Sequence, residues 1–329
     1  SNARMFSLYD ENLYPAEKFG DKELKNFKGR IEFKKVEFAY VEMKEPEENN
    51  KSKKKKPIER IKKEPIFKDL SFKITPNTTV AFVGKSGSGK STIVELLLRL
   101  YNVEENKIQL DNLDIMGYSL KQVRTSIAYV PQENFLFKQT IEENIAFALP
   151  NVDSERVEQA AYASGISKDI SEFKEGYQTV VGERGVTVSG GQKQRISIAR
   201  ALIKDAPILI LDDSLSAVDT LTERHILSEI RKIRENKTTI IIAHRISTLE
   251  TLDKIIVVNN GTIDAIGNHD EGDGVPVNPI AAALIIADKS DVRYTRVRNS
   301  DLATFDIHDR VNYSVKKSSI KINGDKTLL

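Results

Sequence analysis

A short segment rich in glycine and hydroxyl residues has the composition of a phosphate-binding loop. It fits the pattern G-x-x-x-x-G-K-[ST], in which glycines let successive backbone N–H groups turn toward one anion. The lysine supplies a positive charge for the β and γ phosphates of a nucleotide, and the hydroxyl that follows it is a ligand for Mg²⁺. We therefore expect this chain to bind a nucleoside triphosphate; a flexible glycine turn is the alternative that we disfavour. The segment consists of Gly84, Lys85, Ser86, Gly87, Ser88, Gly89, Lys90, Ser91 and Thr92.

The residues on either side of this loop predict the elements that position it. Residues 79–83 form an apolar run typical of a buried strand, and residues 92–98 have the pattern of a helix. The N-terminus of that helix would face the phosphates, where its unpaired N–H groups favour an anion.

About 120 residues after Lys90, a second pattern ends in two carboxylates. Residues 208–211 are uniformly apolar, and Asp212 and Asp213 follow them directly. An apolar strand that ends in aspartates is common, so a simple turn is the alternative. In combination with the phosphate loop, the pattern predicts that Asp212 holds Mg²⁺ through water beside Ser91.

A third segment lies about 20 residues before Asp212 and contains a serine, two glycines and a glutamine. A serine and two glycine amides at the start of a helix make a second anion site. Through this segment the chain resembles the ATP-binding-cassette (ABC) family, whose signature opens a helix in the same way. The resemblance implies an ATPase in which two cassettes pair head to tail with ATP between them, each lending its signature to the other. The signature residues here are Ser189, Gly190, Gly191 and Gln192, preceded by Val188 in place of the usual leucine.

Further positions match the family over roughly residues 29–271. Tyr40 corresponds to the aromatic that stacks on adenine, Gln132 to the loop glutamine that contacts Mg²⁺, and His244 to the switch histidine that senses the γ phosphate. A tyrosine at a strand end and a structural histidine are the alternatives. Residues 216–219 resemble the loop that touches the opposite subunit.

Two further segments, 140–145 and 182–185, resemble the exporter branch of the family. The resemblance therefore implies ATP and Mg²⁺ as cofactors, a second nucleotide-binding domain as partner, and a transmembrane domain missing from this chain. It also implies a place at the cytoplasmic face of the cell membrane, and we expect no nucleic acid.

One catalytic position departs from the family pattern. The residue after the strand aspartate is normally a glutamate that positions the attacking water, whereas this chain has Asp213. An aspartate is one methylene shorter, and displacement of a catalytic group by about 1 Å can cost on the order of 100-fold in rate. The substitution resembles the weaker half of heterodimeric exporters, so we expect a heterodimer, with a homodimer as the alternative. An ATP-dependent dimerisation switch, in which only the partner hydrolyses ATP, is the second hypothesis.

The alternation of strand and helix patterns predicts an α/β domain with a largely parallel sheet. The resemblance implies the ABC-type P-loop NTPase fold, with a parallel-sheet core, an N-terminal antiparallel β subdomain and a helical subdomain at 135–200. We place a linker at 1–29, the nucleotide-binding domain at 30–271 and an atypical tail at 272–329. Strands are expected at 31–40, 66–74, 79–83, 127–130, 208–211, 239–242 and 254–258.

An insert at 42–64 interrupts the domain with charge, acidic first and then strongly basic. Its composition predicts a solvated, disordered loop. Contact of its lysines with anionic lipid or nucleic acid is the alternative, which the acidic half and the missing aromatic residues disfavour.

The composition excludes several classes of protein and site. The 329 residues are 40% hydrophobic and 30% charged, carry a net charge of +2 and include no cysteine, which rules out disulfides and thiolate metal sites. No apolar stretch approaches the roughly 18 to 20 residues that span a bilayer, so we expect a soluble chain. The leading Ser1-Asn2-Ala3 resembles a tag-cleavage remnant, and the chain is expected to be part of a longer protein.

Two further alternatives concern the chain as a whole. A chromosome or repair ATPase would carry a long coiled coil or a zinc insertion between the phosphate loop and the signature, and the sequence has neither. The tail faintly resembles the end of an HD-type phosphohydrolase through His269, Asp270 and Asp288, but we expect a structural tail without catalysis.

Overall fold

The structure is a computed structural model of the 329-residue chain. It describes residues 20–23, 27–44, 59–149, 151, 153–182, 187–243 and 252–268. By its contacts the chain divides into two units, Ser1–Ile263 and Asp264–Leu329, and all described side chains belong to the first. No helix in the described ranges combines the length and the apolar character that crossing a membrane requires.

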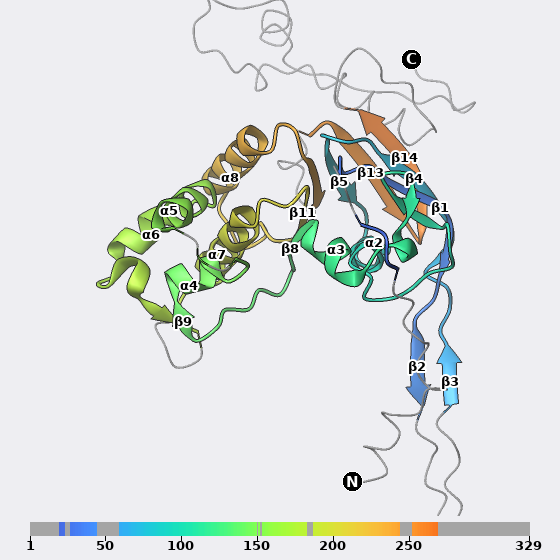
Figure 1. Cartoon of the computed structure of the whole chain (residues 1–329), viewed down its shortest axis with the longest axis horizontal. Coiled ribbons are helices and arrows are strands. Elements are labelled where there is room, and N and C mark those ends of the chain that lie inside the picture. The colour runs from blue at the N-terminus through green and yellow to red at the C-terminus, as the bar shows by residue number, and fades with distance from the viewer. Residues whose placement is uncertain are drawn as a thin grey trace, which may run out of the picture. The chain divides into compact units, whose positions relative to one another are not determined.

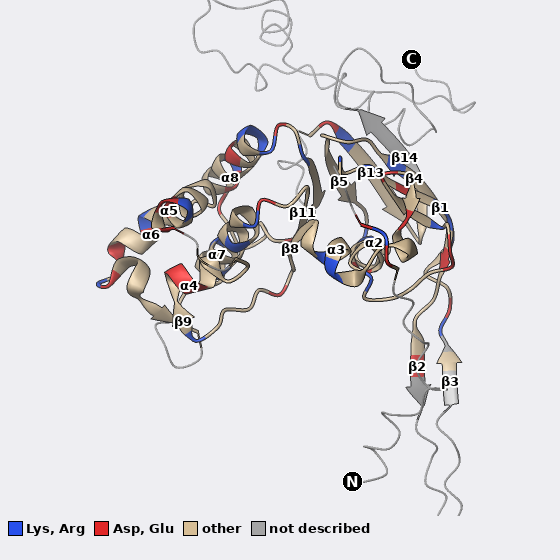
Figure 2. Ribbon diagram, viewed as in Figure 1, with Lys and Arg blue, Asp and Glu red and all other residues tan. Residues whose placement is uncertain are grey.

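A six-stranded sheet forms the centre of the first unit (Figure 1), in the order β14-β13-β5-β12-β11-β8. The pairs from β13 to β8 are parallel. Every residue of β11 and β12 is buried, and Figure 2 shows few charged residues on β5 and β11, as expected for parallel strands covered on both faces. These strands confirm the predicted α/β core. Their bounds are β5 Thr79–Val83, β8 Ile127–Val130, β11 Ile208–Asp212, β12 Thr238–Ile242, β13 Lys254–Asn259 and β14 Thr262–Asn268.

A second, antiparallel sheet has the order β4-β1-β6-β7 and confirms the predicted N-terminal β subdomain. Its strands are β1 Ile31–Phe38, β4 Phe67–Ile74, β6 Ile108–Leu110 and β7 Leu113–Asp114. Buried and exposed residues largely alternate along β4, so only one face meets the core. Phe72 of β4 stacks on Phe33 of β1 with ring centroids 4.5 Å apart and meets Phe82 of β5 edge-on at 5.3 Å. The aromatic contact joins this sheet to the central one.

The expected disorder of residues 42–64 is wrong at both ends of the insert. β2 (Val41–Lys44) and β3 (Glu59–Lys62) pair as antiparallel strands, with Val41 opposite Lys62 and Lys44 opposite Glu59. Figure 1 shows this hairpin extending from the β subdomain. Charge alone did not indicate it, because β pairing satisfies the backbone whatever the side chains are. The charged centre of the insert lies outside the described residues.

Among the residues that the structure describes, four helices and two short strands form a separate helical subdomain beside β8 and β11 (Figure 1). Their apolar side chains make a core of their own, with Ile141, Ile145, Val157 and Ile196 at its centre. This confirms the predicted helical subdomain. Its elements are β9 Gln139–Thr140, α4 Ile141–Ala146, α5 Ser154–Ala163, α6 Ser167–Glu172, the 3-10 turn Gly176–Gln178, β10 Val180–Val181 and α7 Gly190–Ile203.

The other helices of the described residues are α2 Lys90–Leu97, α3 Leu120–Thr125, the 3-10 turn Ile115–Gly117 and α8 Thr220–Ile233. The residue that follows α8, Arg234, is buried and ties the helix to the sheet. Its guanidinium donates to the carbonyls of Ala206, Pro207 and Thr238 and to Oγ1 of Thr239, at 3.0 to 3.2 Å. One side chain thus satisfies four acceptors around the start of β11 and β12.

Arg234→Met should destabilise the domain by about 2 to 5 kcal/mol, because it leaves buried acceptors without donors. Urea unfolding followed by circular dichroism measures this loss. Arg231→Met is the matched control, since Arg231 is exposed on the same helix, and it should stay within about 0.5 kcal/mol of the native chain. Equal stability of all three chains would refute the role of Arg234.

Candidate functional site

The phosphate loop joins the end of β5 to the start of α2, as predicted. Its glycines 84, 87 and 89 have φ angles of +153°, +78° and +104°, in the region that L side chains rarely adopt. Gly89 is also required by space, because a Cβ there would lie 2.5 Å from Cε1 of Phe67. A Cβ on Gly87 would meet nothing within 4 Å, so this glycine serves the backbone conformation alone.

Lys90, the first residue of α2, curls back over the loop. Its Nζ donates to the carbonyls of Gly84 and Lys85, both at 2.9 Å, and lies 3.5 Å from Oγ of Ser88. Burial lowers the pKa of Lys90, while the negative charges of Asp212 and Asp213 act in the opposite direction. The loop therefore holds one ammonium group, 5% exposed, over the backbone that would surround an anion.

The carboxylate of Asp212 lies beside the loop, at the carboxyl end of β11. Its Oδ1 is 3.4 Å from Oγ of Ser91, and its Oδ2 accepts a hydrogen bond of 3.3 Å from the hydroxyl of Tyr129. Burial raises the pKa of Asp212, and the hydrogen bonds from Ser91 and Tyr129 counteract part of that rise. The structure brings the predicted metal residues Ser91 and Asp212 together.

This donor set fits Mg²⁺, which prefers hydroxyl, carboxylate and water oxygens. Ser91 and Asp212 would hold the ion, and the ion would neutralise phosphate charge.

Asp213 and Gln132 also meet at this edge of the sheet. The backbone of Asp213 turns to φ +45°, and its N–H donates to the carbonyl of Ile242 at 3.2 Å. The amide nitrogen of Gln132 donates to Oδ2 of Asp213 at 3.4 Å. The two predicted catalytic residues are therefore neighbours, whereas a metal contact by Gln132 stays a prediction. His244, the third, lies outside the described residues.

Tyr40 contacts two side chains of α2, those of Thr92 and Glu95. Its hydroxyl is 3.0 Å from Oγ1 of Thr92 and donates to Glu95. Its ring meets Phe38 and Tyr101 edge-on, with centroids 5.1 Å away in both cases. Burial and Glu95 raise the pKa of Tyr40 to about 12, so the hydroxyl keeps its proton at neutral pH. Contact of this ring with adenine remains a prediction.

The signature residues begin α7, as predicted. Ser189 and Gln192 form a capping box: Oγ of Ser189 accepts from the N–H of Gln192 at 3.2 Å, and Oε1 of Gln192 accepts from the N–H of Ser189 at 2.9 Å. Gly191 lies so close to the next loop that a Cβ would be 2.8 Å from the carbonyl oxygen of Ala217. The signature is thus packed against residues 216–219 of its own chain.

Comparison with known families identifies this arrangement. Residues 67–216 match the family model described as ABC transporter. The match begins at β4 and includes the loop, Gln132, the signature and both carboxylates. Residues 67–216 are an ABC transporter domain.

Two relatives of this chain are named for multidrug export and for lipid A-core flipping. The chain is 43% identical over 244 residues to YgaD of Bacillus subtilis, named as a multidrug export ATP-binding/permease protein, covering 74% of this chain and 39% of that protein. It is 41% identical to the ATP-dependent lipid A-core flippase of Vibrio vulnificus, covering 81% of this chain and 42% of the flippase. The chain therefore spans about two fifths of the length of these relatives.

A solved structure of a bacterial Atm1-family ABC exporter with ATP bound has the same fold. Its TM-score to this chain is 0.69 at 37% sequence identity, covering 81% of this chain and 44% of that one. The likeness supports the P-loop NTPase fold of the ABC type that the sequence predicts.

Sequence reasoning missed the residues of the ABC transporter domain that hold others in place. Tyr129, Glu95 and Gln194 each bond to a predicted residue or to its loop: Tyr129 to Asp212, Glu95 to Tyr40, and Gln194 to Ala217. Tyr129 carried a weak signal, because it is the one polar side chain in a short strand just before Gln132.

Lys90→Ala should lower the affinity of the ABC transporter domain for ATP by about 100-fold or more, because the site loses its buried cation. Fluorescence titration with a labelled ATP analogue measures it. Lys85→Ala is the matched control: its side chain is exposed in the same loop, and its removal should change affinity by less than about fivefold. Equal losses in both variants would refute the assignment of Lys90.

Proposed function

We propose that this chain is the ATP-binding and ATP-hydrolysing part of an ABC exporter, and that two such domains pair head to tail around ATP to drive export. The observation that carries the proposal is the meeting of four groups at one sheet edge: the ammonium of Lys90, the Ser91 hydroxyl and the carboxylates of Asp212 and Asp213. This set can bind triphosphate, hold Mg²⁺ and orient a water.

The roles follow from position. The loop amides and Lys90 bind and orient the β and γ phosphates, and Asp213 with Gln132 would hold the attacking water in line. The Ser189 hydroxyl and the N–H groups of Gly190 and Gly191 form an incomplete anion site that would act on ATP bound by a partner. Because the two half-sites belong to one chain, a dimer would complete both of its ATP sites together.

The exporter assignment rests on the relatives, which are named for multidrug export and lipid A-core flipping. A transmembrane domain would therefore be the partner through which hydrolysis moves cargo, and the domain would work at the cytoplasmic face of a membrane. We place no cargo on this chain, because none of the described residues belongs to a membrane-spanning segment.

We further propose that this chain is the weaker half of an asymmetric pair. Asp213 supports this, because its carboxylate reaches one methylene less far than the glutamate usual at this place. A dimerisation switch, in which ATP joins the domains and only a partner hydrolyses it, is the second candidate and rests on the same residue.

Asp213→Glu should raise steady-state ATP hydrolysis by about 10- to 100-fold at protein concentrations that favour dimers, because the longer side chain reaches the water. Phosphate release measures the rate. Asp69→Glu adds the same methylene on the exposed face of β4 and should change nothing. Thermal unfolding is recorded alongside, because glutamate is accommodated less well than aspartate at the φ of +45° found at residue 213.

If the native chain hydrolyses ATP rapidly and Asp213→Glu raises the rate only slightly, the hypothesis of an asymmetric pair is wrong. Asp213 would then be a competent catalytic residue, and a homodimeric ATPase would be the better conclusion.

Head-to-tail pairing predicts complementation between two inactive variants. Both variants are made in whichever chain hydrolyses ATP faster, the native chain or Asp213→Glu. Lys90→Ala weakens ATP binding and Ser189→Arg blocks the signature, so each homodimer should be inactive. Mixing them creates dimers with one intact composite site, and hydrolysis should reappear. A mixture as inactive as its components would refute the shared site.

A further inference from the structure

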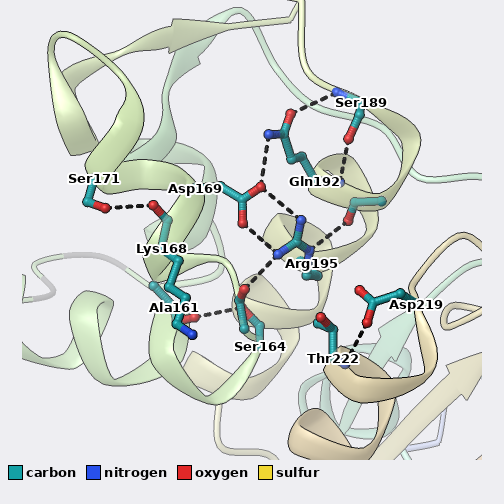
Figure 3. A network of polar contacts seen from close by, with 12 residues as sticks. Ala161, Ser164, Lys168, Asp169, Ser171, Ser189, Gln192, Arg195, Asp219 and Thr222 are labelled. Carbon is teal, nitrogen blue, oxygen red and sulfur yellow. Dashed lines mark hydrogen bonds and ion pairs between the residues drawn. The ribbon is translucent and has the colours of Figure 1, made fainter.

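A carboxylate of the helical subdomain is hydrogen-bonded to two residues in the first turns of the signature helix. Asp169 of α6 accepts three hydrogen bonds: from Nε2 of Gln192 at 3.0 Å, and from Nη1 and Nη2 of Arg195 at 2.6 and 3.0 Å (Figure 3). Both charged side chains are largely covered, at 15% exposure for Arg195 and 19% for Asp169. A bidentate, charge-assisted pair of this kind has a fixed geometry.

Asp169 determines which way the amide of Gln192 points. The Nε2 group faces the carboxylate, so Oε1 faces the N–H of Ser189 and accepts from it at 2.9 Å. If the amide were turned over, its oxygen would face a carboxylate oxygen and its NH₂ would face another donor. Both contacts would be repulsive, so a single orientation of the capping box is stable.

Arg195 keeps Asp169 in this place. Besides the carboxylate, its guanidinium donates to the carbonyl of Gly165 at 2.7 Å and to that of Gly191 at 3.3 Å. One side chain therefore joins the turn between α5 and α6 to the first turn of α7. Burial raises the pKa of Asp169, but the hydrogen bonds from Arg195 and Gln192 outweigh it and hold the pKa below its usual value.

The capping box decides which donors the signature can offer. The N–H groups of Ser189 and Gln192 are used within the box, and Oγ of Ser189 accepts one of them, which leaves its hydroxyl proton to donate outward. The N–H groups of Gly190 and Gly191 are first-turn donors without a partner inside the helix. These three donors make the anion site only while the box is closed.

We infer that Asp169 is a positioning residue for the ATP site of the partner domain. It acts through Gln192 and Arg195, without touching nucleotide, by keeping the Ser189 hydroxyl and the two glycine amides directed outward. The inference rests on the proposed head-to-tail function, because only a partner's ATP could use these donors.

The first experiment is hydrogen–deuterium exchange of the full chain in the absence of nucleotide. Asp169→Asn should speed exchange in the peptide covering residues 187–195 by about tenfold, because charge-assisted hydrogen bonds that keep the box closed are weakened. Glu172→Gln is the matched control: it removes the same charge from the same helix at an exposed position, and exchange should not change. Unchanged exchange in Asp169→Asn, or an equal rise in the control, overturns the inference.

The second experiment separates positioning from a loss of local structure. In Asp169→Asn the ATP concentration that gives half-maximal dimerisation in sedimentation should rise about tenfold, whereas binding of a fluorescent ATP analogue to the dilute monomer should be unchanged. A change in monomer binding would show that Asp169 supports its own chain's site and would overturn the inference, as would unaltered dimerisation. A native chain that never pairs under ATP overturns the proposed function instead, and the partner role of Asp169 with it.

Discussion

The buried ammonium of Lys90 is the charge on which the nucleotide-binding edge depends. A cation at 5% exposure is stable only among acceptors, and the carbonyls of Gly84 and Lys85 supply them. Those carbonyls reach it because the loop glycines adopt positive φ, and the loop is held by β5 on one side and α2 on the other. Asp212, the last residue of β11, and Asp213, which follows it, add negative charge from two strands away in the sheet. The parallel order of the strands is therefore what brings cation and carboxylates to the same edge.

The signature depends on a different set of forces. It starts a helix whose apolar face packs in the core of the helical subdomain, while polar contacts fix its first turn. Gln194 connects it to the loop after β11: its Oε1 accepts from the N–H of Ala217 at 3.0 Å, and its Nε2 donates to Ser216 at 3.3 Å. Ser216 in turn donates to the carbonyl of Asp213 at 2.8 Å. The part of the chain that would serve a partner is thus hydrogen-bonded to the part that would serve itself.

The sequence allowed the core strands and the phosphate loop to be predicted because each is encoded locally. The strands β5, β8 and β11 consist mostly of consecutive apolar residues, and the loop glycines have fixed spacing. The hairpin of β2 and β3 was missed because its pairing is between backbones in a charged segment. Tyr129 and Asp169 were missed for another reason: their partners are 83 and 26 residues away, a relation that no local pattern expresses.

The residue type at position 213 indicated a carboxylate but did not reveal the backbone conformation that the structure shows there. Its left-handed conformation, φ +45°, directs the chain from β11 into the loop that carries Ser216, and its N–H is held by β12. Aspartate tolerates this conformation better than most residues, because its short polar side chain can bond locally. The carboxylate at this position therefore satisfies two requirements, a turn and a place beside Gln132. An aspartate fits this turn better than a glutamate would. In the proposed site it would also reach one methylene less far toward substrate. Under the proposed asymmetric pairing that loss of reach would be tolerable, because the main contribution of this domain would be the signature that it offers to its neighbour.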